Sequence, residues 1–228
     1  MAKKGIIDRP EFRNWVDGMK SPNWDLMPLT HITKGIVLQD IIRSKSIDPS
    51  NCDTLNQDAN FFFYGRPAYR VSGDGTIEVE AACPTCLIFN SAMISQADKI
   101  HAFDTGAFGK RMYKHILLDE MQLVDFSLGN DTSRPNKLIH RVFGTRLAYF
   151  DADTTDALRS DSGAESWEYH AKAYLDLINS PGRNEPDDRV CTIEVVFGGS
   201  VDINAHLMAI VVPHTHWSST KKRHTLKK

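Results

Sequence analysis

Apolar residues fall in short runs along the chain, and several of these runs predict β-strands. Leu29–Thr33, Asn60–Arg66 and Cys86–Phe89 are the clearest of those in the first half. The run Asn60–Arg66 holds three phenylalanines and a tyrosine, which is typical of a strand buried on both faces. Apolar and acidic residues alternate in Ile77–Ala82, so this segment is expected to be a half-buried strand with its two glutamates outside.

The second half of the chain holds two further strand-like runs. Val190–Phe197 and Leu207–Val212 are rich in β-branched and aliphatic residues. Gly198 and Gly199 follow the first run and predict a turn between the two strands. The segment Leu138–Phe150 is compatible with strand, helix or both.

Helical spacing is confined to a few segments. In Ile36–Lys45 pairs of apolar residues recur one turn apart, and Thr33 is expected to cap this helix. Ser162 and Glu165 form a capping box that predicts a second helix. Its apolar face would consist of Trp167, Ala171, Tyr174, Leu175 and Ile178. Lys110–Met121 is a weaker helical candidate.

Many strands, few helices and no strict strand–helix alternation predict an α+β fold with a mixed or split antiparallel sheet. A chain of 228 residues suits one large domain, here expected to span residues 1–220. The last residues, 221–228, form a basic tail. A basic tail can contact phosphates, but the same composition is also typical of a frayed terminus exposed to solvent.

Bulk charge and cysteine content narrow the classes of function. The net charge of −2 requires neither a nucleic-acid nor a membrane partner, and it argues mildly against a wide nucleic-acid footprint. No apolar stretch approaches the ~20 residues of a membrane helix. The N-terminus has no apolar core typical of a signal peptide. We therefore expect a cytoplasmic protein with its four cysteines reduced.

Polar residues inside or beside the predicted strands are the candidates for chemistry. Glu194 lies between Ile193 and Val195, where it either faces water or serves a purpose. His31 and Thr33 are two positions apart on a strand and so share one face, where they could bind a ribose or an amide.

An aromatic strand is followed by a cluster of binding-type side chains. Tyr64 and Tyr69 offer faces on which a planar ring can stack. Arg66 and Arg70 offer planar forks suited to phosphate. Gly65 would allow a close backbone approach.

A single Asp-Thr-Gly tripeptide occurs at residues 104–106, within the segment His101–Phe108. Aspartic proteases use this tripeptide, but they need two copies or a dimer. The single copy here lacks the hairpin context, and a tight turn with an Asx-type bond is the better interpretation.

In their order along the chain these segments resemble the ADP-ribosyltransferase superfamily, and most nearly its DarT-like branch, which modifies nucleic acids. The resemblance rests on His31-Ile32-Thr33 leading into a helix, on the aromatic strand Phe61–Arg66, and on Glu194 in a late strand followed by Leu207–Val212. It covers roughly a fifth of the chain, counted from these segments. It implies an ADP-ribosyltransferase-like fold that uses NAD as substrate.

The resemblance also implies roles for residues. His31 and Thr33 would hold the nicotinamide ribose and carboxamide, and Tyr64, or equally Tyr69, would stack on nicotinamide. Arg66 or Arg70 would bind the pyrophosphate. Glu194 would stabilise the charged sugar and help deprotonate a nucleic-acid or protein acceptor. These residues are then expected to line one cleft between two halves of the sheet.

Two other functions remain open on sequence grounds. Cys83 and Cys86 have zinc-ligand spacing, and His214 and His216 could complete a site, which would indicate a zinc-dependent hydrolase. A single CxxC is weak support for this. The second alternative is a non-catalytic binding module, in which Glu194 and the other candidates would not converge on one pocket.

Overall fold

Antiparallel strands form the centre of the fold in the computed structural model, which describes residues 9–68, 77, 79–154, 164–179 and 188–213. The main sheet has the order β10-β5-β1-β4-β8-β6-β7, with β3 beside β4. Its strands are β1 (Leu29–Lys34), β3 (Ser50–Cys52), β4 (Gln57–Tyr64), β5 (Pro84–Phe89), β6 (Lys99–His101), β7 (Ser127–Gly129), β8 (Glu194–Phe197) and β10 (Leu207–Val211). A small second sheet pairs β2 (Ser46–Ile47) with β9 (Val201–Asp202).

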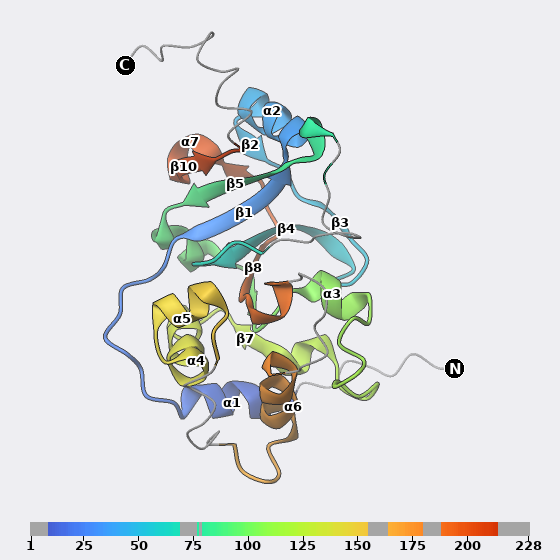
Figure 1. Cartoon of the computed structure of the whole chain (residues 1–228), viewed down its shortest axis with the longest axis vertical. Helices are drawn as coiled ribbons and strands as arrows, with labels where there is room; N and C mark the ends of the chain where they lie inside the picture. Colours follow the sequence, from blue (N-terminus) through green and yellow to red (C-terminus); the bar gives the residue numbers. More distant parts are fainter. Residues whose placement is uncertain (1–8, 69–76, 78, 155–163, 180–187, 214–228) are drawn as a thin grey trace.

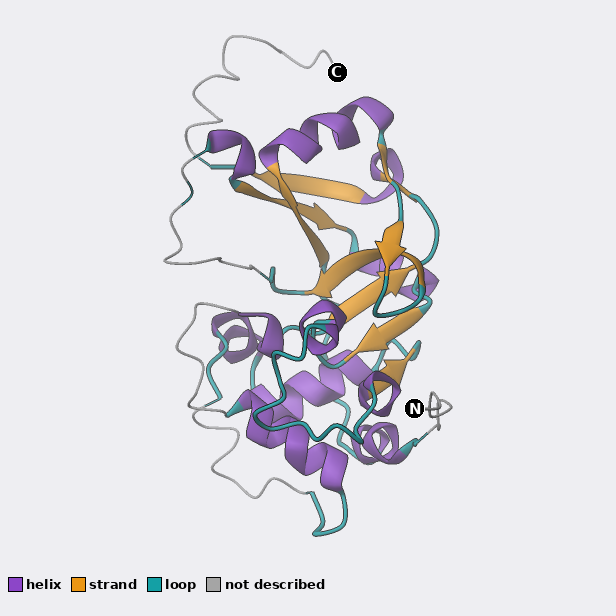
Figure 2. Cartoon of the chain, turned by 90° about the vertical axis from the view of Figure 1, so that its right-hand side faces the viewer, coloured by secondary structure: helices purple, strands orange, loops and turns teal. Residues whose placement is uncertain are grey.

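Helices gather at both ends of this sheet (Figures 1 and 2). They are α1 (Glu11–Asp17), α2 (Gly35–Ser44), α3 (Thr105–Gly109), α4 (Arg134–Phe143), α5 (Arg146–Asp151), α6 (Tyr169–Ile178) and α7 (Ile203–His206). Short 3-10 helices are η1 (Glu80–Ala82), η2 (Ser91–Gln96), η3 (Leu123–Phe126) and η4 (Asp188–Cys191). In Figure 1, α2 and α7 lie at the upper end, whereas α1, α4, α5 and α6 lie at the lower end.

The sheet divides where β1 leaves β4. β1 pairs with β5 at all six of its residues, but with β4 only through Leu29 and Thr30. Beyond that point, the Nδ1 atom of His31 lies 2.8 Å from the carbonyl oxygen of Phe61. A side chain thus links β1 to β4 beyond the point where their backbone pairing has ended.

Phe62 on β4 joins the two halves. Its ring is fully buried and meets Phe89 of β5 and Phe197 of β8 in edge-on contacts at 5.2 Å between centroids. Edge-to-face packing at this distance is the favoured geometry of aromatic pairs. Because these rings come from three strands, the halves share one apolar core.

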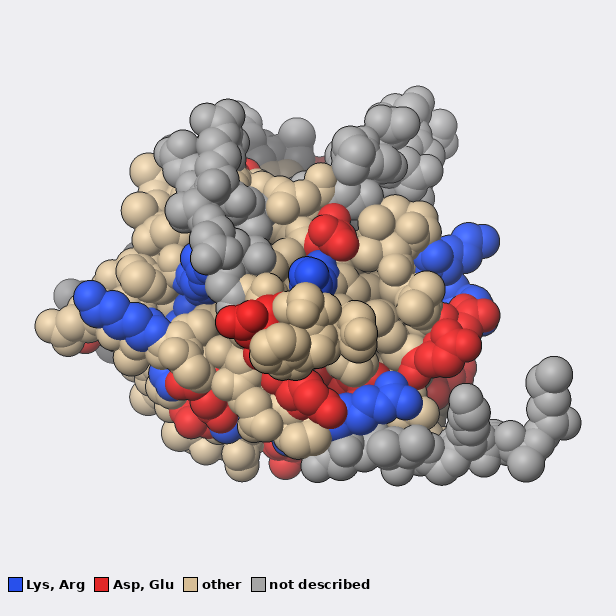
Figure 3. Space-filling view, turned by 90° about the horizontal axis from the view of Figure 1, so that it is seen from below, with Lys and Arg blue, Asp and Glu red and all other residues tan. Residues whose placement is uncertain are grey.

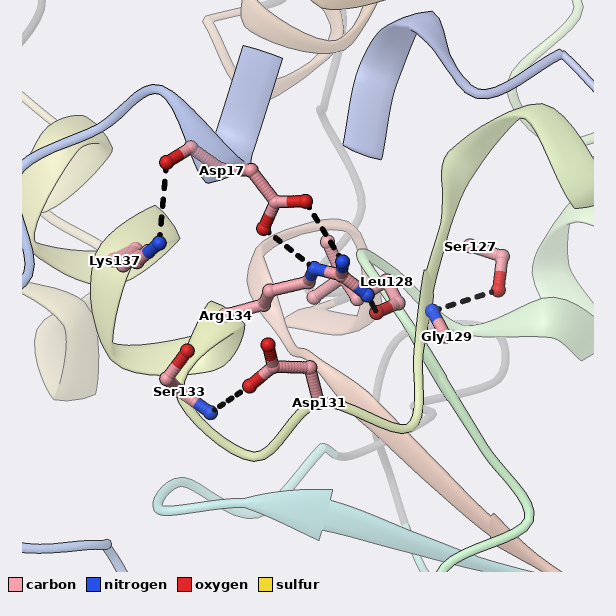
Figure 4. A network of polar contacts seen from close by, with 8 residues as sticks. All are labelled: Asp17, Ser127, Leu128, Gly129, Asp131, Ser133, Arg134 and Lys137. Carbon is pink, nitrogen blue, oxygen red and sulfur yellow. Dashed lines mark hydrogen bonds and ion pairs between the residues drawn. The ribbon is translucent and has the colours of Figure 1, made fainter. Parts of the chain in front are cut away.

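An ion-pair network ties the first helix to the lower bundle (Figure 4). The Nε and Nη2 atoms of Arg134 each donate to the carboxylate of Asp17 at 2.7 Å, and Nη1 donates to the carbonyl of Leu128 at 2.8 Å. A paired guanidinium favours the charged carboxylate, so the Arg134 bonds lower the pKa of Asp17. One arginine therefore holds α1, α4 and β7 together.

Several predicted elements are confirmed. Strands occur at Leu29–Lys34, Gln57–Tyr64 and Pro84–Phe89, and the predicted helix near residue 36 is α2. Leu138–Phe150 proves to be helical, as parts of α4 and α5. The α+β class with an antiparallel sheet is observed, and every pairing among the described strands is antiparallel.

Other predicted elements are wrong. The alternating segment after Ile77 contains the 3-10 helix η1 and no strand among its described residues. Lys110–Met121 forms turns with no α-helix. Lys34 rather than Thr33 is the N-cap of α2, and its side chain makes no capping bond. The helix predicted after Ser162 is confirmed as α6, and Ala171, Tyr174, Leu175 and Ile178 are buried as expected. It begins only after Glu168, however, so Trp167 precedes it and is 67% exposed; Ser162 lies outside the described residues.

Strand order also departs from expectation. Val190–Cys191 lies in η4, and the strand β8 begins only at Glu194. Leu207–Val211 is a strand, but it does not pair with β8 across a turn. It lies at the far edge of the sheet beside β5.

Two surface properties bear on partners. On the face seen in Figure 3, acidic and basic side chains lie interspersed among the described residues, without one broad patch of a single sign. Among the residues that the structure describes, no helix combines the length and apolar character needed to cross a membrane.

Candidate functional site

Glu194 lies in the middle of the sheet and is only 2% exposed. In the antiparallel pairing it is directly opposite Phe63 of β4 on one side and His101 of β6 on the other. Side chains of directly paired residues project from the same face of a sheet. Glu194 and His101 are therefore neighbours on one face, and of the two alternatives for Glu194 the one in which it faces water is excluded.

The carboxylate of Glu194 is held by the chain just after β6. The backbone N–H of Thr105 donates to both carboxylate oxygens at 3.3 Å. Asp104 caps α3 by accepting from the N–H of Ala107 at 2.5 Å, and it lies 4.0 Å from the guanidinium of Arg189. We call His101, Asp104, Thr105, Arg189 and Glu194 the Glu194 cluster.

A buried tyrosine fixes the backbone that precedes Glu194. The hydroxyl of Tyr149 donates to the carbonyl of Tyr64 at 2.7 Å and accepts from the N–H of Ile193 at 3.2 Å. It thereby joins β4 to the start of β8. A hydrogen-bonded anchor of this kind is needed because polar backbone groups in a buried segment must all find partners.

The electrostatic environment of Glu194 disfavours its charged form. Burial raises the pKa of Glu194 well above its ordinary value, and the nearby charge of Asp104 raises it further. The hydrogen bonds from Thr105 and the charge of Arg189 act in the opposite direction. The site therefore holds a carboxyl group whose neutral form is favoured by its surroundings.

His101 is the neighbour of Glu194 with the most unusual surroundings. It is 2% exposed, and neither ring nitrogen has a hydrogen-bond partner among the described residues. Burial, helped by the charge of Lys99, lowers the pKa of His101 to about 4, so its imidazole is neutral near pH 7. The hydroxyl of Thr105 is also buried, and together with the backbone N–H of the same residue it lowers the pKa of Glu194.

His31 and Thr33 do not meet Glu194. Thr30, not His31, pairs with Phe63 in the row that contains Glu194. Because successive strand residues face opposite sides, His31 lies on the other face of the sheet. A carbonyl can only accept, so His31 donates to Phe61 through Nδ1; burial lowers the pKa of His31 and favours this neutral form. The carbonyl of Thr33 accepts from Thr85.

Tyr64 is fully buried and its hydroxyl is already engaged. It accepts from the N–H of Met27 and donates to the Oδ1 atom of Asn136, both at 3.0 Å. A ring enclosed in this way offers no stacking face to nicotinamide. The structure gives Tyr64 the role of joining β4 to α4 and to the segment before β1.

Replacing Tyr64 with phenylalanine tests this role. The change removes both bonds and takes this partner from the buried Oδ1 of Asn136 and from the partly buried N–H of Met27, so we expect a loss of about 1–3 kcal/mol in the free energy of unfolding. Urea denaturation measures it. The control is Tyr169→Phe at a 67% exposed position, which should change stability by less than about 0.5 kcal/mol. Unchanged stability in Tyr64→Phe would contradict the role.

The remaining candidates from the aromatic segment are only partly described. Arg66 is 4% exposed, and its carbonyl accepts from the hydroxyl of Thr30 at 3.2 Å. Its charge lies close enough to the buried Tyr149 to lower the pKa of that phenol, against a larger rise caused by burial. Arg66 is thus built into the interior rather than presented to a pyrophosphate. Tyr69 and Arg70 lie outside the described residues.

The proposed zinc ligands do not form a metal site in the described part of the chain. Cys86 is buried, and burial raises the pKa of its thiol to about 11. Cys83 is half-buried. No group of three or more potential ligands occurs among the described residues, and His214 and His216 lie outside them.

The sequence did not identify most of the Glu194 cluster. It singled out the segment around Asp104 only to exclude a protease, and it gave no reason to choose Arg189 or His101. The one available signal was the combination of ionisable and apolar residues in His101–Phe108, which is unusual for an exposed loop.

Compared with protein-family models, with curated proteins and with solved structures, the chain matches none.

Proposed function

We propose that the protein cleaves NAD between nicotinamide and ribose and transfers the ADP-ribosyl group to an acceptor. The observation that carries this proposal is the burial of Glu194 between two apolar neighbours, Ile193 and Val195. An apolar side chain would be more favourable in this place. A buried ionisable group with a perturbed pKa and a specific charge partner is a candidate for function.

A single carboxylate is sufficient for this chemistry. Breaking the bond between nicotinamide and ribose builds positive charge on the sugar, as in glycoside cleavage. A carboxylate beside the sugar stabilises that charge and can accept a proton from the attacking group. Nicotinamide leaves without being protonated, so no second acid is required.

The raised pKa of Glu194 is compatible with this role. The nicotinamide ring of NAD is positively charged, and a cation near a carboxyl group favours its ionised form. Binding of NAD would therefore lower the pKa of Glu194 and favour its carboxylate form. Arg189, which already favours the ionised form, acts in the same direction.

The other residues do not take the roles implied by the resemblance. His31 and Glu194 do not converge on one pocket, which is the feature expected of the alternative, a non-catalytic binding module. His31 lies on the opposite face, and the hydroxyl of Tyr64 is bonded twice, so neither is assigned a catalytic role. Because Glu194 is 2% exposed, NAD can reach it only if the residues packed over it, on α3 and η4, move aside. The acceptor is proposed to be a nucleic acid or a protein.

The test is to incubate the purified protein with NAD and to follow nicotinamide by chromatography. Wild type and Glu165→Gln, a change at an exposed glutamate, should release nicotinamide, whereas Glu194→Gln should not. Single-stranded DNA, RNA and a protein mixture are then added separately with NAD labelled in its adenine ring to find the acceptor. Absence of both nicotinamide release and calorimetric NAD binding would refute the function.

A further inference from the structure

We propose that His101 is a positioning residue for Glu194: its imidazole supplies the N–H that holds the Glu194 carboxylate once this group becomes charged. The two residues are direct partners in the pairing of β6 with β8. Directly opposed Cβ atoms in an antiparallel pair are ~5 Å apart, within reach of an imidazole and a carboxylate. The inference deepens the proposed function and, for its catalytic consequences, rests on it.

The burial of His101 is the independent observation. Both ring nitrogens are buried without hydrogen bonds to other described residues. Leaving such a group unpaired in the interior is unfavourable, and an apolar residue of similar size would avoid this. His101 is therefore poorly explained by packing in the resting protein, and a bond that forms only when Glu194 ionises accounts for it.

The charged groups around Glu194 and His101 determine how much the Glu194 carboxylate would gain from a hydrogen bond with His101. Asp104 and Arg189 face Glu194 from α3 and η4, Thr105 donates to it from its backbone, and Lys99 acts on His101 from β6. Burial and Asp104 oppose ionisation of Glu194 more strongly than Thr105, through its side chain and its backbone N–H at 3.3 Å, and Arg189 favour it. A neutral imidazole adds a further donor without adding charge.

Three substitutions at His101 separate positioning from packing. His101→Leu removes the donor and should keep or raise the melting temperature, because an unpaired polar group is lost. It should nevertheless lower kcat for nicotinamide release roughly tenfold to a hundredfold, the usual effect of losing a group that orients a functional side chain. KM for NAD should change little. His101→Asn and His101→Gln restore an N–H near Nδ1 and Nε2 respectively, and one of them should recover activity.

A measurement without NAD tests the pair itself. The infrared carbonyl band of protonated Glu194, assigned by its absence in Glu194→Gln, is followed against pH. In His101→Leu the band should persist to higher pH than in wild type, since loss of the donor raises the pKa of Glu194. An unshifted band would overturn the positioning role, whether or not the protein cleaves NAD. If the band shifts but wild type neither releases nicotinamide nor binds NAD, the pairing stands and the proposed function fails.

Discussion

Glu194→Gln should be inactive and yet more stable than wild type at neutral pH. Removing the charge that stabilises the sugar should reduce nicotinamide release roughly a hundredfold or more. The free energy of unfolding should increase, because glutamine occupies the same space without an ionisable group. Few substitutions of a merely structural residue would separate activity from stability in this manner.

The stability difference should depend on pH in a defined direction. A carboxyl group in the unfolded chain titrates near pH ~4.3, whereas burial and Asp104 raise the pKa of Glu194 in the folded protein. Between these two values the folded state keeps a proton that the unfolded state has lost, so wild-type stability falls as pH rises. The glutamine side chain of the Glu194→Gln variant does not titrate, so the variant should lose no stability from this position over the same interval.

Urea denaturation of wild type and Glu194→Gln at a series of pH values measures this difference. The two proteins should have similar stability near pH ~4, below the interval, and should diverge above it. Glu165→Gln, at an exposed position, is the control and should follow wild type throughout. A variant that is less stable than wild type at pH ~8 would mean that Glu194 is charged in the folded protein.

Phe62→Ala should give the largest loss of stability of any change discussed. Phe62 is fully buried and contacts aromatic rings on β5 and β8, so its truncation removes contacts on both sides of the split. Phenylalanine-to-alanine changes in cores lower the free energy of unfolding by about 3–5 kcal/mol. Urea denaturation measures it, with the slope checked for two-state behaviour.

The neighbouring residue supplies a matched control. Phe61 precedes Phe62 on the same strand, faces the other side and is only partly buried. Phe61→Ala removes the same atoms and should be distinctly less destabilising, because less apolar surface was withdrawn from water. Equal losses in both variants would show that Phe62 does not join the two halves.

The sequence predicted elements where the local pattern is strong and uniform. The aromatic run of β4 is a strand because a strand buries many adjacent apolar side chains in few residues, whereas the aliphatic run of β10 is an edge strand whose side chains from Met208 to Val211 are exposed. In the segment after Ile77 apolar and acidic residues alternate as they do in a half-buried strand, yet this segment contains the 3-10 helix η1. Local periodicity does not report whether a partner strand is available.

Of the Glu194 cluster, the sequence predicted only Glu194 as a site residue. Glu194 stood out because it interrupts an apolar strand. His101 and Arg189 did not stand out in the sequence. They lie near Glu194 because of how strands pair and how distant segments pack, and the local sequence shows neither. His31 and Glu194 were expected in one cleft, but a one-residue difference in register places them on opposite faces. Sequence order indicates which strands exist, and it does not fix their pairing.

The central position of β8 has a consequence for how the protein is made. β8 is among the last strands in the chain, yet it lies between β4 and β6, which do not pair with each other. Contacts between segments far apart in sequence form late, because the intervening chain must first be closed into a loop. While the protein is being synthesised, β6 and β7 have no strand that links them to the rest of the sheet until Phe197 has emerged. Glu194 enters with that same strand, so a nascent or truncated chain has neither a closed sheet nor its proposed catalytic group.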